Sequence, residues 1–197
     1  VPDPRVDKLC EMFKPKKITH AVMEYFDIAG QASSRGKGME PQTLQTLKNA
    51  DSLIVVLDAF RDKAEPVRDF DSIISELLFT DLVVVTGRLE RIERDLRSGK
   101  SGELLLEKSV IEKCRILLED GKPLSELELD CEEEKSIRGF QFLSRKPLII
   151  VVNISEDALV NGRAGEYEKL FAGVKNSACA AMCAEIEMEI ASLDEND

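Results

Sequence analysis

The sequence predicts an α/β fold with a mainly parallel sheet, because short apolar runs alternate with long amphipathic stretches. Continuous apolar runs at 52–57 and 147–152 are typical of strands covered on both faces. Residues 18–26, rich in β-branched and aromatic side chains, predict an earlier strand that buries Val22 and the aromatic rings. A weaker run at 178–183 predicts a fourth strand.

The middle of the chain has the spacing of helices. Apolar residues recur at helical intervals across 66–97, and the proline at its start suits the first helical turn, where a missing N–H is no loss. We expect a turn at 98–102 and then a second helix through Leu118, which ends at the glycine and proline of 121–123. Two long helices joined by a short turn form an antiparallel hairpin, which we interpret as a coiled coil.

A third helix is expected after this hairpin. Asp130 followed by Glu133 matches a capping box, and the helix is predicted to run to about Leu143. Since strand patterns flank the helices on both sides, we interpret 65–145 as a helical insertion in an α/β domain. The α/β core then consists of two segments, 1–64 and 146–197.

Composition excludes several classes of function. Lys and Arg total 27 against 38 Asp and Glu, so the net charge is -11. This charge argues against strong sequence-independent binding to nucleic acid or to an anionic membrane, because both require a cationic surface. We expect neither a membrane nor specific DNA as a partner. No apolar run approaches the roughly 18 residues of a membrane span, and the polar start VPDPRVDKLC is not a signal peptide. The five cysteines are therefore expected to be reduced thiols of a cytoplasmic protein.

The motif DIAG ends the first predicted strand. A carboxylate at the end of a strand, here Asp27, can hold Mg²⁺ through water, and Gly30 allows its backbone N–H to approach a phosphate closely. The alternative is an ordinary turn after a strand, which on four residues alone is the commoner case.

The motif NISE follows the third predicted strand. The Asn153 amide and the Glu156 carboxylate are suited to recognising the edge of a purine base, and ligands of open α/β sheets bind at the carboxyl ends of strands. The alternative is a turn in which Asn and Ser cap the next helix.

The order of these features is that of P-loop NTPases of the GTPase type: a strand with DIAG, a helix, a strand, and later a strand with NISE. With stretches such as VPDPRVDKL, KPKKITHAVMEYFDIAG and KPLIIVVNISED, nearly the whole chain resembles the YchF family of Obg-like ATPases. That family has NxxE in place of NKxD and prefers ATP over GTP. The resemblance implies a partial P-loop NTPase sheet with the helical hairpin inserted, and a cytoplasmic protein that associates with the ribosome.

The same resemblance assigns residues on the base side of the site. Asn153 and Glu156 are expected to contact the base, and Cys183 with Ala184 corresponds to the loop beside it. Glu185 departs from the family, which usually has Lys there, and this weakens the expected stack on the purine.

On the phosphate side, the resemblance makes Asp27 the carboxylate of the Mg²⁺ site and Gly30 the contact of the γ-phosphate. Gln31 follows, at the place where Ras-like GTPases position water. It indicates either that mode of hydrolysis or a polar residue in a mobile loop. The expected cofactors are ATP, or GTP, and Mg²⁺.

The sequence has no Walker A loop, GxxxxGKS or GxxxxGKT. Its one GKS, at 99–101, lacks the required glycine at Arg94 and follows a predicted helix. The cradle for the β-phosphate is therefore expected from a missing P-loop segment of the parent protein. The leading hypothesis is the nucleotide-binding portion of a YchF-like ATPase. The alternative is a non-catalytic protein-interaction module with a degenerate nucleotide site and the helical hairpin as its binding surface.

Overall fold

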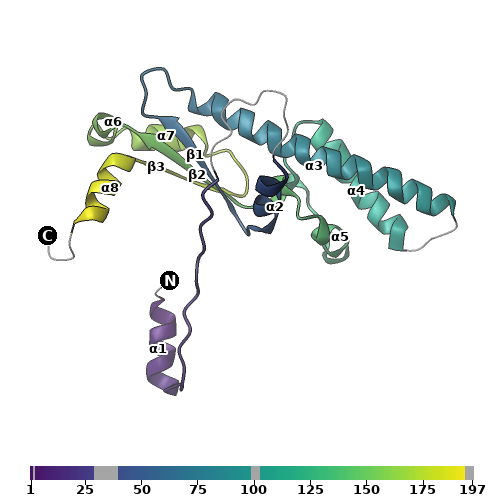
Figure 1. Cartoon of the computed structure of the whole chain (residues 1–197), viewed down its shortest axis with the longest axis horizontal. Helices are drawn as coiled ribbons and strands as arrows, with labels where there is room; N and C mark the ends of the chain where they lie inside the picture. The colour runs from purple at the N-terminus through teal and green to yellow at the C-terminus, as the bar shows by residue number, and fades with distance from the viewer. Residues whose placement is uncertain (2, 29–39, 99–102, 194–197) are drawn as a thin grey trace. The chain divides into compact units, whose positions relative to one another are not determined.

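The computed structural model describes residues 1, 3–28, 40–98 and 103–193, and Figure 1 traces their helices and strands. The chain forms two compact units, Val1–Arg35 and Gly36–Asp197. The elements in chain order are α1 (Pro4–Phe13), α2 (Pro41–Asn49), β1 (Leu53–Ala59), α3 (Pro66–Arg97), α4 (Glu103–Glu119), the 3₁₀ helix η1 (Leu124–Glu126), α5 (Cys131–Ile137), η2 (Arg138–Phe140), η3 (Leu143–Arg145), β2 (Leu148–Ile154), α6 (Glu156–Val160), α7 (Ala164–Leu170), β3 (Ser177–Met182) and α8 (Ala184–Ser192).

The first unit consists of α1 followed by an irregular segment. The Asp3 carboxylate caps α1 by accepting a hydrogen bond from the Arg5 backbone N–H at 2.9 Å, and it also pairs with the Arg5 guanidinium at 2.8 Å. Lys14 ends the helix in the left-handed region, with φ of 43°. From there to Ile28 the chain has neither helix nor strand.

The predicted strand at 18–26 is wrong. Its side chains, which were expected to be buried, are exposed: Val22 by 81% and Phe26 by 64%. A strand is stable only when its backbone groups pair with a neighbour, and no described strand pairs with these residues. The Val1 ammonium donates to the Ala21 carbonyl at 2.7 Å, but this single contact forms no strand pair. Their β-branched and aromatic composition reflects a fit to a pleated surface, which by itself supplies no hydrogen-bonded partner.

The predicted parallel α/β sheet is confirmed in the second unit. It has three strands in the order β1-β2-β3, and both pairs are parallel. Asp58 of β1 lies opposite Asn153 of β2, which in turn lies opposite Met182 of β3. These three residues therefore lie at the carboxyl edge of the sheet, where a ligand site was expected.

The described helices cover one face of the sheet. Helices α3, α6 and α7 pack on this face against Val55 and Leu57 of β1 and against Ile150 and Val152 of β2. Phe70 of α3 meets Phe171 there edge to face, with ring centres 5.1 Å apart.

On the opposite face, the side chains of Ile54 and Val56 are 47% and 65% exposed, and that of Ile149 is 40% exposed. The apolar runs were expected to be covered on both faces. That expectation is half wrong, because the described helices with buried contacts to the sheet pack on one face.

Helices α3 and α4 pack side by side over a second core (Figure 1). α3 has the bounds that the sequence predicted. Arg88 of α3 and Glu107 of α4 form a two-pronged ion pair at 2.6 and 2.7 Å beside this core. The buried residues of this core are Leu78, Val85, Leu89, Val110, Ile111, Cys114, Leu118, Leu124, Ile137 and Phe142.

The predicted turn residues 99–102 lie outside the described residues, and the coiled coil stays a prediction. No described helix is long and apolar enough to cross a membrane.

The predicted capping box of α5 is confirmed. The Asp130 carboxylate accepts hydrogen bonds from the Glu132 and Glu133 amides at 2.8 Å, and Glu133 accepts one from the Asp130 amide at 3.2 Å. The predicted end near Leu143 is wrong, because α5 stops at Ile137. A 3₁₀ turn, η2, follows it, and Gln141 then lies in the left-handed region with φ of 52°. Further along, the Leu143 amide donates to a side chain of α3 at 2.9 Å.

We expect Ile150→Ala to lower the free energy of unfolding by about 2–5 kcal/mol, because it empties a fully buried position of the sheet core. Ile149→Ala is the matched control on the same strand, and its 40% exposed side chain should cost below about 1 kcal/mol. Urea unfolding followed by circular dichroism measures both. Equal losses in the two variants would contradict the one-sided burial of the sheet.

The five free cysteines provide a second test of burial. Desolvation raises the pKa of the Cys114 thiol to about 11. Since the thiolate is the reactive form, we expect Cys114 to resist maleimide at about pH 8 while exposed Cys131 is modified. Timed labelling with mass spectrometry measures both rates, and in denaturant they should become similar. Equal rates in the native protein would contradict the core between α3 and α4.

Candidate functional site

The candidate site lies where the three parallel strands end. Asn153 is the half-buried residue at this edge of β2, and its Oδ1 accepts a hydrogen bond from the Ala184 backbone N–H at 3.0 Å. This bond joins residues 31 positions apart and ties the end of β2 to the start of α8. Two of the residues predicted to lie beside a base are thus in direct contact.

The loop after β3 contributes mainly its backbone. The Cys183 side chain is 1% exposed and packs inward, whereas Ala184 and Glu185 are exposed. Glu185 and Glu187 occupy the first turn of α8, where negative charge interacts favourably with the helix dipole. An acidic residue at position 185 therefore suits the start of this helix.

The predicted alternative, a Ser cap for the following helix, is also present. The Ser155 hydroxyl accepts a hydrogen bond from the Ala158 amide at 3.3 Å and caps α6. Glu156 is the first residue of α6, and its side chain is exposed. NISE therefore combines a helix cap at Ser155 with an Asn153 side chain that stabilises the neighbouring loop.

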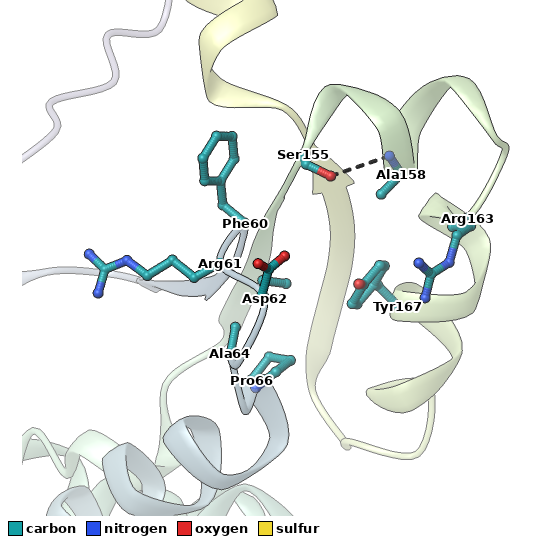
Figure 2. A pocket seen from close by; sticks show the side chains of 10 residues that line it. Phe60, Arg61, Asp62, Ala64, Pro66, Ser155, Ala158, Arg163 and Tyr167 are labelled. Atoms are coloured by element: carbon teal, nitrogen blue, oxygen red, sulfur yellow. Dashed lines mark hydrogen bonds between the residues drawn. The ribbon is translucent and has the colours of Figure 1, made fainter.

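Sequence reasoning missed a pocket of about 290 Å³ beside this edge. It lies between the loop after β1 and the segment from α6 to α7 (Figure 2). The Arg163 guanidinium lies 5.7 Å from the centre of the Tyr167 ring and pairs with Glu166 at 3.1 Å. Figure 2 shows Arg61 extending away from Arg163 and Tyr167. Ser155 of NISE lines this pocket, whereas Asn153 and Glu156 do not, and the other lining residues belong to neither DIAG nor NISE.

The outer side of β3 is held by α7. The Glu168 carboxylate accepts a hydrogen bond from the Ala181 amide at 3.3 Å. Burial, with a smaller contribution from Glu168, raises the pKa of the Cys179 thiol. This strand is therefore held on both sides, by β2 and by α7.

Of the residues predicted for the phosphate side, Asp27 is the one that the structure describes. Asp27 is exposed and belongs to the first unit, whereas Asn153 and Ala184 belong to the second. Gly30 and Gln31 lie outside the described residues. Among the described residues, no group of three or more His, Cys, Asp or Glu side chains is arranged to hold a metal ion. The metal role of Asp27 and the catalytic roles of Gly30 and Gln31 stay predictions.

The chain was compared with known families and structures. No family model matches it. It is 31% identical to the ribosome-binding ATPase YchF of Haemophilus influenzae over 207 residues, and it is 30% identical to Obg-like ATPase 1 of Oryza sativa subsp. indica over 217 residues. These matches cover 100% and 94% of this chain, and 57% and 55% of the two relatives.

A solved structure gives the same result. The YchF GTPase of Schizosaccharomyces pombe superposes with a TM-score of 0.80 at 27% identity, covering 100% of this chain and 57% of the other. The chain spans little more than half the length of the relatives it matches. Over its whole length, the chain is thus homologous to one part of the longer proteins of the YchF family of Obg-like ATPases.

Proposed function

We propose that the chain forms the base-binding side of the nucleotide site in a YchF-like ATPase. The observation that carries the proposal is the hydrogen bond between Asn153 and Ala184, at the edge of the sheet where ligands of α/β proteins bind. The relatives named as a ribosome-binding ATPase and an Obg-like ATPase support it.

On the base side, Asn153 uses Oδ1 for the loop, which leaves its amide N–H groups for a ring nitrogen of the purine. The exposed Glu156 carboxylate accepts a hydrogen bond from a base amino group. Ala184 and the backbone of Cys183 lie next to the base. A carboxylate accepts from adenine and guanine alike, so the preference for ATP rests on the resemblance to NxxE families.

On the phosphate side, Asp27 would hold Mg²⁺ through water, Gly30 would contact the γ-phosphate, and Gln31 would position the attacking water. Protein sites for Mg²⁺ commonly use one or two carboxylates together with nucleotide phosphates. Asp27 therefore fits the ion as part of a nucleotide complex. When bound, Mg²⁺ would neutralise charge that develops on the phosphates.

A cradle for the phosphates is the remaining requirement, and we propose that a P-loop strand and loop from the rest of the parent protein supply it. The exposed apolar segment at 18–26 and the position of β1 at the edge of the sheet support this proposal. The 197 residues alone should then hydrolyse little or no ATP.

The domain organisation follows from the same proposal. The sheet has its own core, and α3, α4 and α5 have another. These separate cores support a boundary between the sheet and the helices of 65–145, and we propose that 65–145 is a helical, coiled-coil hairpin inserted in an α/β domain made of 1–64 and 146–197. A cytoplasmic location follows from ribosome binding by relatives.

The alternative function is a non-catalytic interaction module that uses the α3–α4 pair. Phe79 and Val83 lie one helical turn apart on α3 and are 64% and 57% exposed. Leu105 of α4 is 56% exposed. Apolar side chains in this position suit a protein partner. The ribosome is one such partner, given the name of the Haemophilus influenzae relative.

Calorimetry with ATP, ADP and GTP in the presence of Mg²⁺ tests the nucleotide proposal. We expect adenine-selective binding, weakened about tenfold or more in Asn153→Ala because a base contact and the fixed loop are both lost. Asn153→Asp retains the acceptor for Ala184 but lacks the amide donor, so it should also weaken binding.

Hydrogen exchange at the Ala184 amide is the control that separates the two effects. It should accelerate in Asn153→Ala and stay slow in Asn153→Asp. Absence of nucleotide binding at millimolar concentration, or equal affinity in all three proteins, would contradict the base-binding role and favour the interaction module.

A further inference from the structure

Asp81 of α3 is a buried carboxylate that the proposed nucleotide site does not use. Its residue is 1% exposed. Oδ1 accepts a hydrogen bond from the Leu143 amide at 2.9 Å, and Oδ2 accepts two from Ser144, from the amide at 2.8 Å and the hydroxyl at 2.7 Å. Burial raises the pKa of Asp81, while these hydrogen bonds oppose the shift. Both carboxylate oxygens are thus satisfied by one short turn.

Asp81 lies at the boundary between two apolar cores. Leu77, one turn before it, packs with Leu53 of β1 and with Leu143. Leu78 and Val85 instead belong to the core shared with α4 and α5. In the two turns before Asp81, α3 contacts both cores, and Ile74 packs against both of them. After Asp81, its buried residues Val85 and Leu89 belong to the helical layer, meaning α4, η1, α5 and the part of α3 after Asp81.

The turn that Asp81 binds also contacts the helical layer. The Ser144 hydroxyl accepts a hydrogen bond from the Leu124 amide at 3.2 Å. Arg145 donates to the carbonyls of Leu124 and Leu127 at 2.8 and 3.2 Å, and it pairs with Glu134 of α5. The turn at 143–145, which contacts η1 and α5, is therefore fixed to α3 through the Asp81 carboxylate.

The same turn is also joined to the sheet. Lys146 donates from Nζ to the carbonyls of Lys48, at 3.0 Å, and Ala50, at the end of α2. β2 begins two residues later, at Leu148, and pairs with β1 along its length. Movement of this turn would therefore change the position of the helical layer relative to the sheet.

We propose that Asp81 is an orienting latch, which fixes the helical layer to the sheet so that the two cores move as one body. Buried polar groups often specify one arrangement among several that apolar contacts alone would allow. Because each side has its own core, loss of the latch should let the helical layer pivot about α3 while both sides stay folded.

Pulsed electron spin resonance tests this latch through the distance between two nitroxides. Non-natural labelled residues would replace exposed Ser109 of α4 and exposed Ala178 of β3, which leaves the cysteines unchanged. We expect one narrow distance distribution in the otherwise native chain. Asp81→Ala should lose that narrow peak while circular dichroism retains the helical signal, and Ser144→Ala, which removes one of three donors, should broaden it less.

Arg88→Gln is the matched control, because it removes an ion pair that lies within the helical layer. It should leave the distribution narrow. An unchanged distribution in both Asp81→Ala and Ser144→Ala would overturn the proposal. Unfolding of the helical layer in Asp81→Ala would also overturn it, because Asp81 would then maintain the core and not its orientation.

Discussion

One buried carboxylate determines how the sheet and the helices of this chain meet. Asp81 binds the turn before β2 through three hydrogen bonds. An ionised group without partners would be costly at this depth, so the turn must present its amides to α3. The same turn carries Arg145, which contacts η1 and α5, and it leads directly into β2, the strand that carries Asn153.

The described residues cover one face of the sheet and leave part of the other exposed. One face packs against α3, α6 and α7, while Val56 on the other face is 65% exposed, and β1 is an edge strand among the described strands. The chain also spans 57% of the YchF relative from Haemophilus influenzae. An exposed apolar face and an unpaired edge are the two features that an added strand and helix would cover.

The sequence predicts elements well where a local pattern determines them. The apolar runs became β1, β2 and β3, and the bounds of α3 and the capping box at Asp130 are confirmed. Prediction from the sequence fails where a contact between distant residues determines the local structure. Residues 18–26 lack a partner strand, and the Leu143 amide binds a side chain 62 positions away. In the candidate site, Asn153 and Ala184 were predicted as separate contacts of the base, and the fold joins them by a hydrogen bond. The pocket beside Tyr167 depends on three segments and has no sequence signature.

Amide chemical shifts of the ¹⁵N-labelled chain, titrated with ATP and Mg²⁺, test the central claim most directly. The base-binding assignment predicts that the largest changes fall on Asn153, Glu156 and Ala184, at the carboxyl edge of β2 and β3. Changes confined to the pocket lined by Arg163 and Tyr167, or no changes at all, would contradict it.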